Sequence, residues 1–191
     1  MLVVGVTGRA QHGKDTIGHL LVERYGFVRY GFADALKELA LDVDPILTTD
    51  PEDGRPFGLY QLVAEQGWES AKQWSEVRRL LQALGVGVRE LVSPDAWVHA
   101  LHRRLLVERP ERAVITDVRF PNEQEYIDQA LSGWTFHVHR PYFDSGVSAD
   151  HESERYVDDL PVSFSFENSG TVEELHELVA AFMDRVVLGE A

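Results

Sequence analysis

Short apolar runs alternate with longer stretches of helical periodicity along this chain. Five apolar runs have the length of strands, at residues 2–7, 27–32, 113–118, 134–139 and 163–167. After the first run, residues 14–25 carry apolar side chains at the spacing of one helix face. Strands separated by helices favour βαβ units, because parallel strands need a crossover connection. The pattern predicts an α/β fold: a five-stranded parallel sheet between two helical layers, doubly wound.

Two further segments refine this organisation. The residues from Thr171 to Glu174 form a capping box, and an apolar stripe at helical spacing follows it. Residues 67–106 look mostly helical and are too long for a simple crossover, so we expect an inserted helical subdomain, and residues 42–58 are the best candidate for a loop. We predict one domain over residues 1–191, with a core at 1–42 and 108–191, an insert at 43–107 and a polar segment at 140–155.

Composition narrows the functional classes. The 191 residues carry a net charge of −14, which disfavours binding to polymeric nucleic acid but not to a single nucleotide. The absence of cysteine excludes disulfides and thiol chemistry. No segment approaches the roughly 20 apolar residues of a membrane span, and the first residues resemble a core strand more than a signal peptide. We therefore expect a cytoplasmic protein.

The first loop carries the strongest chemical signal. Two glycines five positions apart and then a lysine follow the first strand and open the first helix, which is the spacing of a phosphate-binding loop. Glycines let several backbone N–H groups point at a phosphate, and the lysine adds a mobile positive charge. Asp15 stands where Ser or Thr usually binds Mg²⁺, and the side chain of His12 could still point to solvent. The candidate ATP-binding residues are Gly8, Arg9, Gln11, His12, Gly13, Lys14, Asp15 and Thr16.

Other interpretations of this loop are weaker. A glycine-rich turn before an amphipathic helix would have the same composition, but the position between a strand and a helix favours nucleotide binding. A GTPase would need an Asn-Lys-x-Asp motif, and the chain has no Asn-Lys pair. A small-molecule kinase and a non-catalytic nucleotide sensor both remain.

Charged residues at strand ends are the next candidates, since ligands of parallel sheets bind at the carboxyl ends of strands. Asp34 and Lys37 follow the second strand one helical turn apart, and they are either substrate ligands or a surface ion pair. Asp117 ends a buried apolar run, where a metal-binding carboxylate is expected, and Arg119 follows on the same side of the extended chain. The alternative for Asp117 and Arg119 is a structural pair in a turn.

These blocks together resemble the bacteriophage deoxynucleoside monophosphate kinases. The resemblance rests on the segments that begin at Gly13, Phe32, Arg79, Ile115, His151 and Asn168, in that order and over nearly the whole chain. The most specific segment runs Asp-Val-Arg-Phe-Pro-Asn-Glu from residue 117, and the Gly-Lys-Asp variant of the phosphate loop is shared with the family. One departure is Val86-Gly87-Val88-Arg89, where a threonine is expected soon after Gly85.

The resemblance implies a mechanism and further site residues. It implies that ATP donates its γ-phosphoryl group, with Mg²⁺, to a deoxynucleoside monophosphate, that residues 140–155 act as a lid, and that the protein works in the host cytoplasm if a phage encodes it. A homodimer built on the insert is plausible. Candidate catalytic residues are Lys14, Asp117, Arg119 and Arg140, and the metal candidates are Asp15 and Asp117. Candidate substrate residues are Asp34, Lys37, Trp68, Arg78, Arg79, Gln82, Trp97 and Arg119, with Asn168 near the adenine and Arg155 on the lid.

Several alternatives stay open at this point. The chain could be another small-molecule kinase, and dephospho-coenzyme A kinase shares an Asn-x-Gly turn before its last helix. It could also be a non-catalytic nucleotide-binding regulator or an interaction protein. The tryptophans of the insert, Trp68, Trp74 and Trp97, could stack on a base or belong to a core. Two histidine pairs, His99 with His102 and His137 with His139, are more typical of solvated or core residues than of a metal site.

Overall fold

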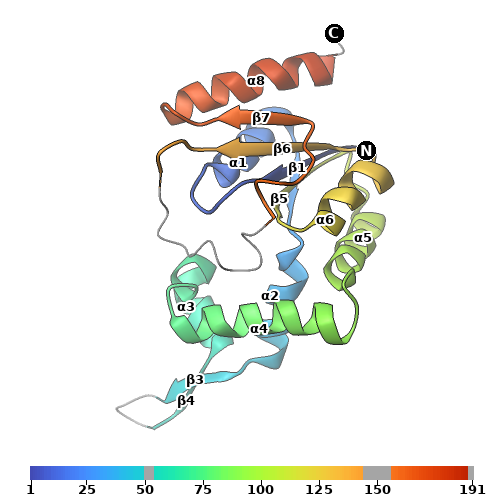
Figure 1. The fold of residues 1–191 in the computed structure, drawn as a ribbon. Helices are drawn as coiled ribbons and strands as arrows, with labels where there is room; N and C mark the ends of the chain where they lie inside the picture. Colours follow the sequence, from blue (N-terminus) through green and yellow to red (C-terminus); the bar gives the residue numbers. More distant parts are fainter. Residues whose placement is uncertain (50–53, 144–155, 189–191) are drawn as a thin grey trace. The chain divides into compact units, whose positions relative to one another are not determined.

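The computed structural model describes residues 1–49, 54–143 and 156–188 (Figure 1). Within these described ranges, seven strands lie in two sheets. In chain order the elements are β1 (Leu2–Thr7), α1 (Lys14–Tyr25), β2 (Val28–Tyr30), α2 (Ala33–Val43), β3 (Ile46–Thr49), β4 (Pro56–Gly58), α3 (Leu59–Ala71), α4 (Ser75–Leu91), α5 (Ala96–Glu108), β5 (Arg112–Val118), α6 (Pro121–Glu125), η1 (Tyr126–Ala130), β6 (Trp134–His139), β7 (Phe164–Glu167) and α8 (Val172–Leu188).

The larger sheet confirms the predicted architecture. Its five strands have the order β2-β5-β1-β6-β7, and all neighbours are parallel. The predicted boundaries of β1 and β6 match the observed ones, and β5 and β7 differ by one residue, whereas β2 is only three residues long. In register, Thr7 of β1 pairs with Val118 of β5 on one side and with His137 of β6 on the other. The carboxyl ends of these three strands therefore meet at one edge of the sheet.

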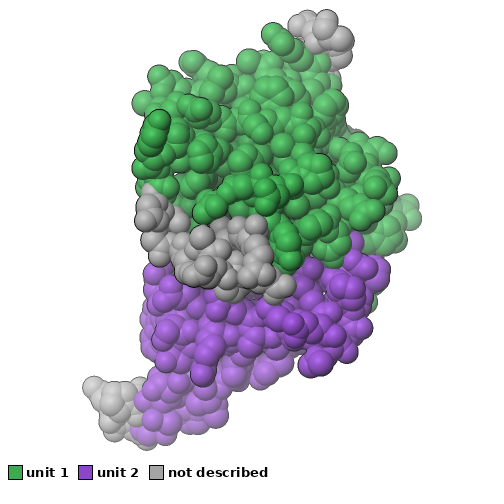
Figure 2. Space-filling view, in the orientation of Figure 1, with its two compact units in different colours: residues 1–32, 101–191 green, residues 33–100 purple. Residues whose placement is uncertain are grey.

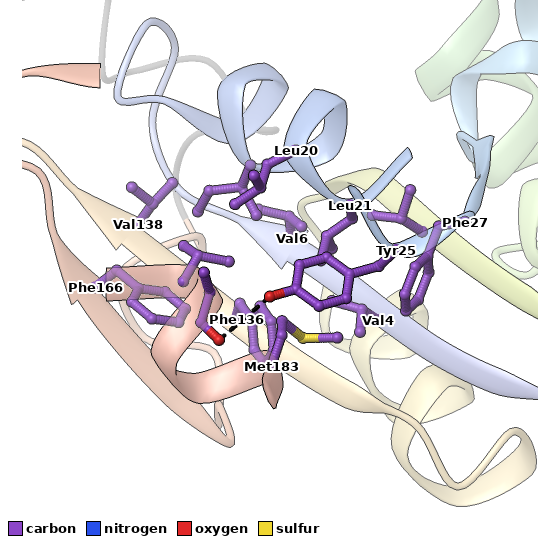
Figure 3. Close-up of a cluster of buried hydrophobic side chains, with 14 of the residues drawn as sticks. Val4, Val6, Leu20, Leu21, Tyr25, Phe27, Phe136, Val138, Phe166 and Met183 are labelled. Atoms are coloured by element: carbon purple, nitrogen blue, oxygen red, sulfur yellow. Dashed lines mark hydrogen bonds between the residues drawn. The ribbon is translucent and has the colours of Figure 1, made fainter. Parts of the chain in front are cut away.

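Alternate residues of the central strand face two different helical layers. Val4 and Val6 belong to a buried cluster formed with α1 and α8, including Leu21 and Met183, which Figure 3 shows in close-up. Gly5 faces the opposite way, and a Cβ atom at this position would collide with Ile127 of η1. This strand alternation produces the three predicted layers.

Local signals explain where the two flanking helices begin and end. At the start of α1, Gly13 has a φ of 113°, and at its end Gly26 adopts a left-handed conformation with a φ of 68°. The predicted capping box before α8 is confirmed: Thr171 N–H donates to the Glu174 carboxylate at 2.7 Å, and Glu174 N–H donates to the Thr171 hydroxyl at 3.2 Å. Both helices thus begin where the sequence predicts.

The chain divides into two compact units, coloured separately in Figure 2. The core unit contains residues 1–32 and 101–191, and the insert unit contains residues 33–100. Within the insert unit, α2, α3 and α4 pack around a cluster of buried side chains, and the predicted helical content of residues 67–106 is confirmed. The buried members of this cluster are Ala40, Leu59, Leu62, Ala71 and Val77.

One local prediction is wrong in the insert unit. Residues 42–58 are not simply a loop, because β3 and β4 form an antiparallel pair in which Ile46 lies opposite Gly58 and Thr49 lies opposite Pro56. The β-branched residues of β3 favour an extended chain, and Leu47 and Phe57 pack against the buried cluster. That packing stabilises a strand pair that two short strands would not maintain alone.

Part of the expected lid cannot be compared with the structure. Of the segment 140–155, only residues 140–143 are described, so Arg155 and the segment that begins at His151 lie outside the described residues. Across the described part of the chain, no helix combines the length and the hydrophobicity needed to cross a bilayer.

Candidate nucleotide-binding site

The two glycines of the phosphate loop are required by close packing. Gly8 has a φ of 138°, and a Cβ atom there would collide with the backbone carbonyl of Val138 on β6. A Cβ atom at Gly13 would lie 2.8 Å from the side-chain nitrogen of Asn168 and 3.2 Å from Leu175. A larger residue at either position would displace the loop from its contacts with β6 and α8. The loop is thus tightly shaped by the sheet edge beneath it.

Lys14 lies at the start of α1 inside this loop. Its side chain is largely buried, and its Nζ donates a hydrogen bond of 2.7 Å to the backbone oxygen of Arg9. A lysine folded back across the loop presents its charge where the loop N–H groups and the positive end of α1 also converge. Asp15, in the first turn of the same helix, is exposed. These are the features expected of a phosphate-binding loop.

Arg9 extends from the loop to a partner that is far away in sequence. Its guanidinium donates two hydrogen bonds, of 2.8 and 2.6 Å, to one oxygen of Asp158. The other oxygen of Asp158 lies 3.5 Å from Nε2 of His137, which is too long for a strong hydrogen bond. Burial raises the pKa of Asp158, but the hydrogen bond and the charge of Arg9, together with His137, outweigh this and keep that pKa below its ordinary value. Asp158 is therefore an anionic anchor for Arg9.

Of the two orientations left open for His12, the structure shows the buried one. Only 3% of the residue is exposed, and its Nδ1 accepts a hydrogen bond of 3.1 Å from the backbone N–H of Arg140. The backbone oxygen of His12 accepts a further hydrogen bond, of 2.9 Å, from the side chain of Asn168. The physical reason is that the loop passes close over β6 and β7, which leaves this side chain a polar partner beneath it. His12 therefore connects the loop to the strands that flank it.

Asp117 lies near the end of β5, next to the strand that leads into the phosphate loop. One of its carboxylate oxygens accepts a hydrogen bond of 2.8 Å from the backbone N–H of Phe32, which fixes the orientation of the carboxylate. Among the described residues, no group of three or more acidic, histidine or cysteine side chains could hold a metal ion. Mg²⁺ in phosphoryl-transfer sites commonly uses one or two carboxylates, with phosphates and waters completing its shell. Asp117 and Asp15 fit this donor set.

Arg119 is positioned by a buried glutamate. Glu123 is only 2% exposed, and its carboxylate accepts the backbone N–H groups of Arg119 at 2.8 Å and of Phe120 at 3.1 Å. Helix α6 begins at Pro121, and Glu123 lies in its first turn. The bonds from Glu123 therefore close the turn that joins β5 to α6. The backbone of Arg119 is thus held in place by the Glu123 carboxylate.

A surface pocket lies beside the turn that follows β7. Its volume is about 430 Å³, and it is lined by residues of that turn and of α8, including Asn168, Ser169, Gly170, Leu175 and Leu178. The side chain of Asn168 donates to the phosphate loop, and its backbone N–H donates to His139 at 2.7 Å. Asn168 therefore ties the loop to β6, in addition to its predicted place near the adenine, which stays a prediction.

The acceptor candidates of the insert unit lie on two of its helices. The Asp34 carboxylate is 3.9 Å from the Lys37 ammonium, at the start of α2. Arg78, Arg79 and Gln82 are all exposed on α4. These positions are accessible to a ligand, and the roles that we predict for them remain predictions.

The tryptophans of the insert unit take part in its packing. Trp97 is 7% exposed and donates its indole N–H to the oxygen of Gly85 at 3.2 Å. Trp68 packs against the buried cluster, and Trp74 stacks on Phe57 with 6.3 Å between ring centres. Packing in the core was the alternative to base stacking for these tryptophans, and it explains the burial of Trp97 in particular.

Sequence analysis missed two residues that shape the site. Asp158 pairs with a residue 149 positions away, and no local pattern announces such a contact. Glu123 could have been found, because a glutamate in the first turn after a proline is a signal for a helix start.

At Arg140, the observed contacts are its N–H bond to His12 and a guanidinium placed 4.7 Å from the centre of the Phe143 ring.

Comparisons with known proteins bear on the family and on the fold of this chain. The profile of the deoxynucleotide monophosphate kinase family matches residues 46–179. A protein of Acanthamoeba polyphaga mimivirus, named as a candidate deoxynucleotide monophosphate kinase, is 26% identical and covers 96% of this chain and 97% of its own. The deoxynucleoside-5'-monophosphate kinase of Escherichia phage T5 is also 26% identical, over 66% of this chain and 71% of its own.

A solved structure supports the fold. Dephospho-CoA kinase from Campylobacter jejuni superposes with a TM-score of 0.50 and 13% sequence identity, over 99% of this chain and 98% of its own. At this identity the likeness bears on architecture alone. The family profile, by contrast, covers well over half of the chain. Its matched range begins after the phosphate loop, so the loop is a separate indication of nucleotide binding. The chain belongs to the deoxynucleotide monophosphate kinase family.

Proposed function

We propose that this protein transfers the γ-phosphoryl group of ATP to a deoxynucleoside monophosphate, giving ADP and the deoxynucleoside diphosphate. The observation that carries the proposal is the phosphate loop between β1 and α1, with Lys14 folded across it. The family match adds the acceptor class, since it rests on residues 46–179 and not on the loop. The two lines of support are therefore independent.

The donor half of the mechanism follows from the loop. Backbone N–H groups between Gly8 and Gly13 surround the β- and γ-phosphates, and the Lys14 ammonium neutralises charge on the transferring group. The pocket beside Asn168 and Gly170 is a suitable place for the adenine. Asp15 and Asp117 would hold Mg²⁺, which supplies charge neutralisation on the donor phosphates.

The acceptor half needs positioning more than proton transfer. A monophosphate has its second pKa near 6, so its attacking oxygen is already ionised at neutral pH and needs no general base. Arg119, or Arg78 and Arg79 on α4, would hold this phosphate, because a guanidinium matches two phosphate oxygens at once. Asp34 and Lys37 would contact the sugar and phosphate, Gln82 the base edge, and Trp68 a base face. Arg140 would stabilise the transferring group.

The proposal also covers the biological setting. DNA precursor supply in the cytoplasm, or in a phage-infected host, fits an acidic chain that disfavours polymeric nucleic acid. We further propose that residues 43–107, most of which belong to the insert unit, act as the acceptor-binding insert and that any homodimer forms on it.

A second candidate function is phosphorylation of a hydroxyl on another small molecule. It is favoured by the fold shared with dephospho-CoA kinase. In that case the reaction would need a base for the hydroxyl proton, and Asp34 would be the natural one. A non-catalytic nucleotide regulator is a third candidate, and it would bind ATP without acceptor-dependent ADP release.

The test is ADP release with Mg-ATP and a panel of acceptors. The panel contains the four common deoxynucleoside monophosphates, their ribonucleotide counterparts and dephospho-coenzyme A. Turnover with one or more deoxynucleoside monophosphates supports the proposal and also gives its base and sugar selectivity. Turnover with dephospho-coenzyme A alone would support ATP binding at the phosphate loop but reject a deoxynucleoside monophosphate as the acceptor. ATP binding without turnover would favour the regulator.

A further inference from the structure

Two side chains of the phosphate loop contact other segments of the core unit. The glycine and lysine spacing of such loops leaves the four residues after the first glycine open, and Arg9 and His12 occupy two of these positions. Arg9 is hydrogen-bonded to Asp158, and His12 to the backbone of Arg140. The loop is thus fixed from two sides by residues that the general motif does not specify.

The contact made by His12 constrains its protonation state. Its Nδ1 accepts from the backbone N–H of Arg140 at 3.1 Å, and an acceptor nitrogen carries no proton. The imidazole therefore has to be neutral, with its proton on Nε2. Protonating Nδ1 would place two N–H groups against each other in a buried setting and break the contact.

The surroundings of His12 favour the neutral form. The neighbouring groups that act on it are the ring of His139, whose centre lies 5.5 Å away, together with Lys14, Arg9 and Asp158. Burial lowers the pKa of His12, and the charges of His139, Lys14 and Arg9 lower it further, whereas Asp158 raises it. The Phe143 ring packs edge-on at 6.0 Å and adds no charge. The pinned state is thus the stable one at neutral pH.

We propose that neutral His12 is a positioning residue, which holds the phosphate loop in the shape that binds a triphosphate and releases it when protonated. Three contacts of the loop meet at or next to His12. Its side chain pins the loop to the end of β6, its backbone oxygen accepts from Asn168, and the next residue, Gly13, has no room for a Cβ atom beside Asn168. The inference rests on the proposed function in one respect, namely that the ligand is ATP.

The sign of the pH effect separates this role from simple electrostatics. A protonated histidine near a phosphate loop adds positive charge, which by itself would strengthen the binding of an anion at low pH. A positioning role predicts the opposite, because protonation disrupts the loop. Since the pKa of His12 is lowered, the loss should appear below pH 6.5 and be absent at pH 8.

The experiment measures the dissociation constant of ATP by calorimetry between pH 5 and 8, with three variants of the full chain. His12→Phe keeps a ring but removes the acceptor, and should weaken ATP binding roughly 10- to 100-fold at pH 8. His12→Asn returns an acceptor near the position of Nδ1, and should recover most of that loss while removing the weakening at low pH. His19→Asn changes an exposed histidine on α1 and serves as the control.

The outcomes are distinct. The inference is supported if ATP binding below pH 6.5 weakens more in the wild type than in His12→Asn. Protonation of ATP itself affects both proteins equally, so the difference between them reports on His12. Equal pH profiles, or tighter wild-type binding at low pH, would overturn it. If His12→Phe does not fold, the comparison of wild type with His12→Asn still decides. Absence of ATP binding by the wild type at every pH would reject the proposed function, and this inference with it.

Discussion

The phosphate loop and the exposed face of α4, the two regions proposed to bind the donor and the acceptor, are built in different ways. In the loop, Gly8 is fixed by a backbone carbonyl, Lys14 by a backbone oxygen and His12 by a buried contact. On α4, Arg78 and Arg79 are long side chains exposed on a helix whose opposite side packs into an apolar cluster. If the proposed roles hold, phosphate recognition is preorganised in the backbone, whereas recognition of the acceptor depends on long, exposed side chains.

The largest expected effect is on the loop. Lys14→Ala should lower kcat/KM by a factor on the order of 10²–10³, because it removes the charge that we propose neutralises the transferring group. Thermal unfolding of this variant should stay close to that of the wild type. Lys72→Ala, which removes the lysine of the Lys72–Glu69 ion pair in the insert unit, is the matched control and should leave kcat/KM unchanged. Substantial turnover by Lys14→Ala would reject the mechanism.

This contrast also explains how far the sequence predicts the molecule. The loop could be predicted, because Gly8, Gly13 and Lys14 have a fixed spacing between a strand and a helix. The sheet could be predicted for a similar reason, since its buried strands are continuous apolar runs. Asp158 could not, because its bond to Arg9 joins residues 149 positions apart. The strands β3 and β4 were missed because packing against a neighbouring cluster, and not their own pattern, stabilises them.

The next test concerns the acceptor side. Arg78→Ala and Arg79→Ala remove adjacent arginines that face different directions on α4. We expect at least one of them to lower kcat/KM for the deoxynucleoside monophosphate roughly 10- to 100-fold, since charge-assisted hydrogen bonds contribute about 1.5–3 kcal/mol. The dissociation constant of ATP should not change. Unchanged acceptor kinetics in both variants would shift the role of phosphate binding to Arg119.

Alanine substitutions of one glycine in the phosphate loop and one on α4 test how rigid each region is. Gly8→Ala should destabilise the fold by roughly 1–3 kcal/mol, because the added methyl group meets the Val138 carbonyl and the residue has a positive φ. Gly87→Ala, on α4, meets no atom within 4 Å and should stabilise the helix by roughly 0.5–1 kcal/mol. Urea unfolding measures both. A tolerated Gly8→Ala would show that the loop is less rigid than its contacts suggest.

A further small effect is expected in the core at the C-terminal end of α1, away from the loop. Tyr25 donates a hydrogen bond of 2.6 Å to Asp184, and Figure 3 shows its ring within the buried cluster. Burial and this bond raise the pKa of Tyr25 to about 12, so its contribution to stability is complete below pH 10 and is lost as pH rises toward 12. Tyr25→Phe should cost about 1 kcal/mol at pH 7 and reduce the alkaline loss. An unchanged alkaline unfolding profile would contradict this assignment.

The central claim is that the γ-phosphoryl group passes directly to a deoxynucleoside monophosphate. It is tested most directly by supplying ATP labelled in its γ-phosphate and following where the label goes. The account predicts labelled deoxynucleoside diphosphate, formed only when the acceptor is present and almost absent with Lys14→Ala. Label that appears only as inorganic phosphate, or only on a hydroxyl-bearing acceptor, would contradict it.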